Sequence, residues 1–126
     1  MKILYILMRT DLASMNPGKA CAQASHATNM FMKNHGSEKD VIDWTNETKD
    51  GFGTVLVMGT DLATMTQVWI DCFNNGIMTG IVNDPTYPIR DGNYTHLVPC
   101  ETCAYAFGER TIIGAIMDRY KISLMP

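Results

Sequence analysis

The sequence predicts a single α/β domain of three layers, in which a four-stranded mixed sheet carries helices on both faces. Three observations predict this class. The chain has 126 residues, so residues 1–126 are expected to form one domain. Apolar runs of strand length alternate with segments whose apolar residues recur at helical spacing. No helical segment separates the last two strands, so these two are expected to pair antiparallel.

The first strand and the first helix carry clear local signals. Residues 2–8 are almost entirely apolar, as expected for a strand buried on both faces. Asn16 and Pro17 are residue types preferred at the N-cap and the first position of a helix. This helix is predicted to run to about residue 34, because Gly36 can end it.

The remaining elements follow from the same two periodicities. They are, in order, a short helix within 37–48, a strand at 54–58, a helix capped by Thr60 or Asp61, a strand at 77–83, a strand within 96–107 and a helix after Gly108. The helix capped by Thr60 or Asp61 has an apolar stripe along one face and is expected to end at Gly76. Residues 84–94 contain Pro85, Pro88 and Gly92, and are predicted to form a long loop, which in compact domains is often functional.

Composition limits the classes of function. The net charge is −3, with 10 basic and 13 acidic residues, which argues against a protein that coats nucleic acid but allows a local basic site. No apolar run approaches the ~20 residues of a membrane span. The apolar start of the chain also lacks the small-residue cleavage site of a signal peptide. We therefore expect a cytoplasmic protein.

The helix predicted from residue 17 carries polar side chains beside its sheet-facing stripe. At 100° per residue, Lys19, Gln23 and His26 fall within one narrow arc. Lys19 lies in the first turn, where a cation opposes the helix dipole at a cost of roughly 0.3–1 kcal/mol. An anion bound by the helix N-terminus and Lys19 would offset this cost. Two interpretations stay open: a functional site, or a solvated lysine beside a surface glutamine and a satisfied histidine.

Other chemical motifs are weak or missing. Cys100 and Cys103 form a CxxC pair, but residues i and i+3 of a strand point to opposite faces, and no second pair completes a zinc site. The four cysteines are therefore expected to be free thiols, without a metal. The sequence has no nucleophile elbow, phosphate-binding loop or dinucleotide fingerprint.

Asp84 directly follows the strand predicted at 77–83. The carboxyl end of a strand is where α/β sheets usually bind ligands. An aspartate at this place can equally be a turn residue that hydrogen-bonds its own backbone. Both interpretations stay open on the residues alone.

The chain resembles the second, archaeal/eukaryotic type of peptidyl-tRNA hydrolases along its whole length, through its opening motif and its order of elements, and less closely in its second half. The matching segments are Arg9-Thr10-Asp11-Leu12, Gly18-Lys19, Ala22-Gln23 and Ser25-His26-Ala27. They follow one another in the strand, loop and helix order of that family, with a slightly longer linker at 13–17. The resemblance implies the fold predicted above, hydrolysis of the ester between a peptide and the 3′ end of tRNA, and no metal or other cofactor.

A second family motif is less well preserved. Counted forward from Gly76, the aspartate of this motif falls on Asp84; counted backward from Pro99, it falls on Asp91. We prefer Asp84, because the strand before it fixes its position. One threonine of the motif matches Thr95. A second would fall on Cys103 or its neighbour Thr102, and the family's Ala-Gly-Arg segment is not preserved.

The resemblance implies roles for these residues. Asp84 would orient or deprotonate a water molecule, and Lys19 would stabilise developing negative charge or hold the terminal phosphate. The candidate substrate contacts are Arg9, Asp11, Gln23, His26, Arg90, Asp91, Thr95 and Thr102. The expected partner is peptidyl-tRNA. Two alternatives stay open: a non-catalytic binder of a tRNA end, nucleotide or protein in the same groove, and a homodimer formed through the apolar last helix.

Overall fold

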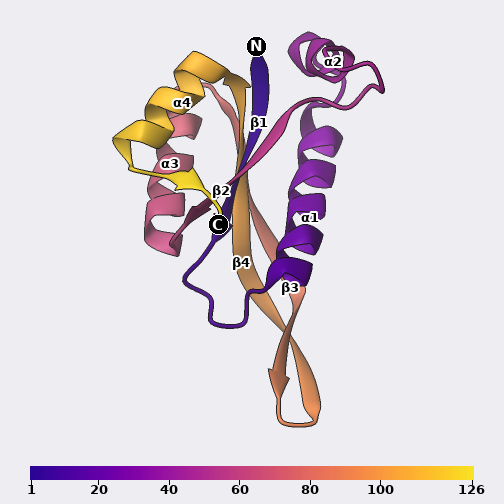
Figure 1. Cartoon of the computed structure of the whole chain (residues 1–126), viewed down its shortest axis with the longest axis vertical. Coiled ribbons are helices and arrows are strands. Elements are labelled where there is room, and N and C mark those ends of the chain that lie inside the picture. The colour runs from indigo at the N-terminus through magenta and orange to yellow at the C-terminus, as the bar shows by residue number, and fades with distance from the viewer.

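In the computed structural model, which describes residues 1–126, the strands form one mixed sheet in the order β3-β4-β1-β2-β5 (Figure 1). The elements are β1 (Lys2–Arg9), α1 (Pro17–His35), α2 (Lys39–Asn46), β2 (Val55–Thr60), α3 (Leu62–Asn74), β3 (Met78–Asp91), β4 (Tyr94–Glu109), α4 (Arg110–Arg119) and β5 (Ser123–Leu124). The predicted α/β class, with an antiparallel β3–β4 pair, is confirmed. The two-residue strand β5 was not predicted, and makes the sheet five-stranded.

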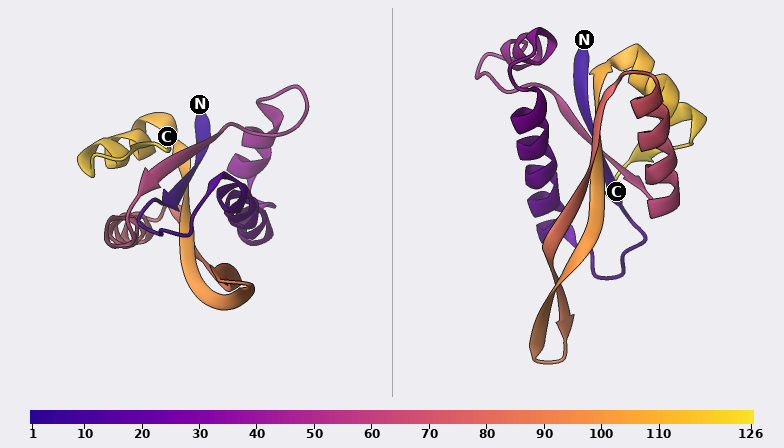
Figure 2. Two further views of the ribbon diagram at one scale, coloured as in Figure 1. Left: turned by 60° about the horizontal axis from the view of Figure 1, so that its bottom comes forward. Right: turned by 180° about the vertical axis from the view of Figure 1, so that it is seen from behind.

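Helices cover both faces of the sheet. Figures 1 and 2 show α1 and α2 on one side of it, and α3 and α4 on the other. The central strand β1 separates the two layers of the core, because successive side chains of a strand point to opposite faces. Ile3, Tyr5 and Leu7 pack with α3 and α4, whereas Leu4 and Ile6 pack with α1 and α2.

The helix starts were predicted from local chemistry, and this prediction is confirmed. The Asn16 side chain accepts a hydrogen bond of 2.8 Å from the Lys19 amide at the start of α1. Asp61, rather than Thr60, caps α3 by accepting a bond of 2.7 Å from the Thr64 amide. Each cap satisfies a backbone donor that the helix itself leaves unpaired.

The prediction of a long loop at residues 84–94 is wrong. β3 continues to Asp91 and pairs with β4 as far as Tyr94, so the two strands form one long hairpin with the two-residue turn Gly92-Asn93. Gly92 has φ +57°, which suits such a turn. The prolines are tolerated because β3 is an edge strand. We call residues 84–100 the arm; Figures 1 and 2 show it projecting beyond the rest of the sheet.

No helix is long and apolar enough to cross a membrane. The four cysteines are unpaired, and Cys72 and Cys103 are buried. Burial raises the pKa of the Cys72 thiol to about 11 and that of Cys103 to about 12.

Candidate functional site

A buried hydrogen-bonded chain joins α1 to both strands of the hairpin. Gln23 is 2% exposed; its Nε2 donates to Asp84 Oδ2 at 2.8 Å. Its Oε1 accepts from Thr102 Oγ1 at 2.6 Å. Both polar ends of the glutamine are therefore occupied, and Thr102 is fully buried. Gln23 and Thr102, both predicted as substrate contacts, hydrogen-bond to each other, and Gln23 also hydrogen-bonds to Asp84.

Asp84 is the last member of this series of hydrogen bonds, which runs from Thr102 through Gln23. Its Oδ1 accepts from the Thr86 amide at 2.9 Å and from Thr86 Oγ1 at 3.2 Å. Burial of this side chain, which is 8% exposed, raises its pKa, but the hydrogen bonds from Gln23 and Thr86 and the nearby His26 outweigh burial and lower the pKa overall. Asp84 is therefore an ionised carboxylate at neutral pH, held by local and distant donors.

His26 lies on the open side of this carboxylate. Its Nε2 is 3.8 Å from Asp84 Oδ2, and about half of its side chain is exposed. At 3.8 Å the two groups are close but do not hydrogen-bond directly.

Lys19, one turn before Gln23, contacts the base of the arm. Its Nζ donates to the Pro88 carbonyl at 2.7 Å and lies 5.2 Å from the centre of the Tyr87 ring. The side chain therefore leans toward the segment that follows Asp84. Its single backbone contact leaves the ammonium group with further donors.

Arg9 and Asp11 pair with each other at the carboxyl end of β1. Arg9 Nε lies 2.9 Å from Asp11 Oδ1, and Arg9 Nη1 donates to the Glu101 carbonyl at 2.9 Å. The hydrogen bond from Arg9 is the main cause that lowers the pKa of Asp11. Asp11 also accepts from the Leu62 amide at the start of α3. This pair ties the loop after β1 to β4 and α3.

The remaining predicted contacts lie apart from Asp84, near the tip of the arm. Arg90 pairs in register with Thr95, and Asp91 with Tyr94. The Asp91 side chain is 80% exposed and lies 3.4 Å from His96. The structure thus joins Gln23, Asp84 and Thr102, with His26 beside them and Lys19 on the segment that follows Asp84. It leaves Arg90, Asp91 and Thr95 outside this group.

Three residues of this site were not predicted: Thr86, Tyr87 and Pro88. Only Thr86 had a signal in the sequence, because a residue two positions after an aspartate often donates its amide to that side chain. Tyr87 is fully buried, which a position between two prolines did not indicate.

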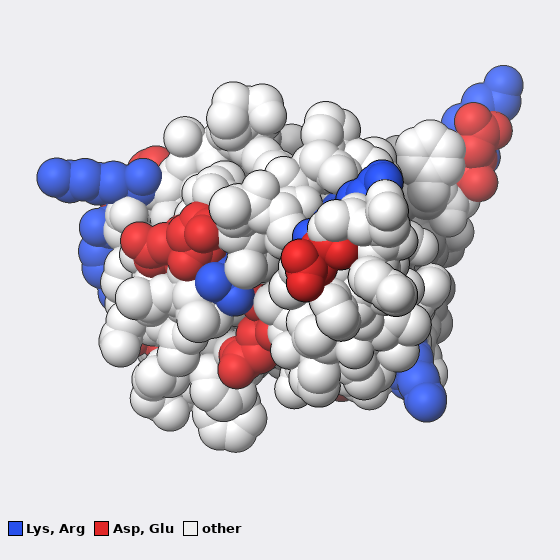
Figure 3. Space-filling model, turned by 90° about the horizontal axis from the view of Figure 1, so that it is seen from below, with Lys and Arg blue, Asp and Glu red and all other residues white.

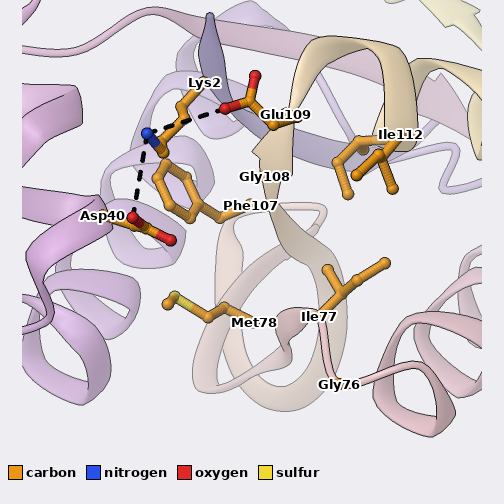
Figure 4. Close-up of a pocket in the computed structure, with 10 residues that line it drawn as sticks. Lys2, Asp40, Gly76, Ile77, Met78, Phe107, Gly108, Glu109 and Ile112 are labelled. Carbon is orange, nitrogen blue, oxygen red and sulfur yellow. Dashed lines mark ion pairs between the residues drawn. The ribbon is translucent and has the colours of Figure 1, made fainter.

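Two surface features help to place the site. Figure 3 shows the molecule from below, from the end where the arm projects; Lys and Arg are scattered among acidic side chains and form no continuous basic patch. A cavity of about 370 Å³ lies at the amino end of β1, with Lys2 between Asp40 and Glu109 (Figure 4). In α/β sheets the carboxyl ends of strands usually bind ligands. Asp84 does not end a strand, as predicted, but lies within β3, because β3 continues to Asp91. It follows Val82, which pairs with Cys103, and Cys103 also pairs with Met8 near the carboxyl end of β1. We therefore place the candidate site at Asp84, beside the carboxyl end of β1, and not in this cavity.

These features describe an α/β protein with a carboxylate and a lysine presented at one end of a mixed sheet. The chain belongs to the peptidyl-tRNA hydrolase PTH2 family, whose model matches residues 2–103. This match includes all the residues gathered around Asp84.

Comparison of structures supports the fold. The chain is similar to a protein of unknown function from Agrobacterium tumefaciens strain C58, with a TM-score of 0.55 and 13% sequence identity. The alignment covers 99% of this chain and 98% of that chain. At this identity the likeness shows the fold alone. No curated protein matches this sequence.

Thr102→Val is expected to weaken the buried chain. Valine keeps the shape of the side chain but removes the hydroxyl, which leaves Gln23 Oε1 buried without a donor. We expect a loss of about 1–3 kcal/mol in the free energy of unfolding, measured by urea titration. Thr95→Val, in the exposed arm, is the matched control and should change stability by less than about 0.5 kcal/mol. Equal losses in the two variants would contradict the proposed importance of this bond.

Proposed function

We propose that this protein hydrolyses the ester bond between a peptide, or an N-blocked amino acid, and the 3′ end of tRNA. The observation that carries the proposal is the Asp84 carboxylate, which is ionised and held by Gln23 and Thr86 beside the helix that supplies Lys19. Membership of the peptidyl-tRNA hydrolase family supports the choice of substrate.

Asp84 is proposed to orient the attacking water. Ester hydrolysis requires a positioned nucleophile, and a carboxylate of lowered pKa is a good hydrogen-bond acceptor but a weak base. This favours orientation of the water over its full deprotonation. His26 Nε2, which lies 3.8 Å from Asp84 Oδ2 and is partly exposed, is proposed as a second contact of this water.

Lys19 is proposed to stabilise the oxyanion that forms when water attacks the ester carbonyl. An ammonium placed at developing negative charge contributes most in a site with little water. Lys19 already has one donor on the Pro88 carbonyl, so its direction is fixed before substrate arrives. A phosphate of the tRNA end is the other anion that the same ammonium would suit.

Lys19→Ala tests this proposal. With an N-blocked aminoacyl-tRNA as substrate, we expect turnover to fall at least tenfold, which is about 1.4 kcal/mol of barrier. Folding should be nearly unchanged, because loss of the Pro88 contact is offset by removal of a cation from the first turn of the helix. Lys33→Ala, in the last turn of the same helix, is the control and should keep wild-type turnover. Unchanged turnover in Lys19→Ala would refute the proposed role.

A non-catalytic binder is the second candidate. It is favoured by the bond that already engages Lys19 with the Pro88 carbonyl, and by the altered segment after Asp84. Protein that binds the blocked aminoacyl-tRNA without releasing its amino acid would support this candidate over the hydrolase.

A further inference from the structure

We propose that Tyr87 is a positioning residue, which fixes the ammonium of Lys19 relative to the Asp84 carboxylate. The inference rests on the proposed hydrolysis, and adds a residue that the family motifs in the sequence did not indicate. It is carried by the local irregularity of β3 and by the contacts of Tyr87 and its neighbour Pro88.

Residues 84–88 form a bulge in the hairpin. β3 advances three residues from Asp84 to Tyr87, while the partner strand β4 advances two, from Val98 to Cys100. One additional residue is thus inserted into β3, next to Pro85, which has no N–H to donate. A bulge re-aims the side chains that follow it, and bulges are common beside active sites.

The Tyr87 ring is fixed from its outer end. It is fully buried, and its hydroxyl lies 3.1 Å from Ser14 Oγ and 4.0 Å from Met15 Sδ. Both partners belong to the loop between β1 and α1, which also leads into Lys19. The loop before the lysine and the bulge after the aspartate are therefore joined through this one side chain.

The Tyr87 ring and the Pro88 carbonyl together hold the side chain of Lys19. Lys19 Nζ is 5.2 Å from the ring centre, within the ~6 Å range of a cation–π interaction. The same atom donates to the Pro88 carbonyl at 2.7 Å. Free lysine side chains sample many rotamers, so two simultaneous contacts restrict the ammonium to one region. The bulge thus carries the carboxylate, its Thr86 donor and the contacts of the lysine.

Three variants and a double mutant test the inference on an N-blocked aminoacyl-tRNA. Tyr87→Leu removes the ring, and we expect kcat to fall about tenfold with KM within about twofold of wild type. Tyr87→Phe keeps the ring and should recover most of this loss. Phe31→Leu trims a buried aromatic farther along α1, and should destabilise the fold without lowering kcat. In a Lys19→Ala background, Tyr87→Leu should have no further effect on kcat, because the ring acts through the lysine.

A shape-matched series covers the case in which Tyr87→Leu fails to fold. Phenylalanine and 3,4,5-trifluorophenylalanine at position 87 differ little in shape, but fluorine withdraws negative charge from the ring face that attracts a cation. We expect kcat to fall with fluorination in the folded proteins.

The outcomes separate this inference from the proposed function. Wild-type protein without hydrolytic activity would refute the hydrolase and, with it, the inference. If wild type is active and Lys19→Ala is impaired, equal kcat across the ring series would overturn the role of Tyr87 alone. Additive losses in the double mutant would also overturn it, because the ring would then act independently of Lys19.

Discussion

Asp84→Asn is expected to lower kcat for an N-blocked aminoacyl-tRNA by about a hundredfold, equivalent to about 2.7 kcal/mol of barrier. Asparagine keeps the size of the side chain but removes the charge that orients water. The oxygen of asparagine still accepts a hydrogen bond, but its amide nitrogen is a donor. One of the two bonds, from Gln23 or from Thr86, is therefore lost. Single-turnover hydrolysis at saturating enzyme measures the chemical step directly.

Asp91→Asn is the matched control, and should stay within about twofold of wild type. Its side chain lies 80% exposed, with His96 as its partner. The opposite ranking of the two variants would mean that Asp91 is the functional aspartate. Negligible effects of both would favour the non-catalytic binder.

Asp84→Asn should also change how the stability of the folded protein responds to acid. The pKa of Asp84 is lowered in the folded protein from a usual value of 3.8. Its ionised form therefore stabilises the fold above the unfolded pKa, and this contribution is lost as the pH falls through the folded pKa. Between neutral pH and strong acid, wild type should lose more unfolding free energy than Asp84→Asn does.

Phe31→Ala is expected to lower the free energy of unfolding by about 3–5 kcal/mol. The ring is fully buried on the sheet-facing side of α1, with its centre 5.7 Å from Trp44, 5.4 Å from Tyr105 and 5.0 Å from Phe107. Alanine would remove contacts to α2 and to β4 together and leave a cavity. Urea unfolding followed by tryptophan fluorescence measures the change.

Phe73→Ala provides the comparison for Phe31→Ala. Phe73 is 67% exposed on α3, so its removal should cost less than about 1 kcal/mol. Similar losses for the two phenylalanines would contradict the packing described for α1.

Elements with local signals were predictable. The apolar run of β1 and the Asn16-Pro17 start of α1 act over a few residues, and neither depends on distant parts of the chain. The hairpin was missed because Pro85 and Pro88 weigh against a strand. Gly92-Asn93 is a favoured hairpin turn dipeptide, and was the signal in the sequence for the true structure.

The candidate site was predictable only in part. The helical arc placed Gln23 beside the sheet, but it could not show that Thr102, 79 residues away, occupies the other end of its amide. Likewise, counting along the family motif left two aspartates. Gln23 contacts Asp84, and this contact depends on how β3 meets α1 in space. It is the reason that we propose Asp84, rather than Asp91, as the functional aspartate.

The position of β1 in the sheet has a consequence for how the chain folds. β1 lies between β2, with which it pairs parallel, and β4, whose paired residues begin at Cys103. β1 is synthesised before the other strands, but its partner β4 is synthesised only when most of the chain has been made. The edge of β1 that pairs with β4 is therefore unpaired until then. Closing so long a loop is entropically costly, whereas β3 and β4 meet across a two-residue turn. We expect the hairpin to form early in folding and the β4-facing edge of β1 to pair late, so that the nascent chain exposes this aggregation-prone edge for most of its synthesis.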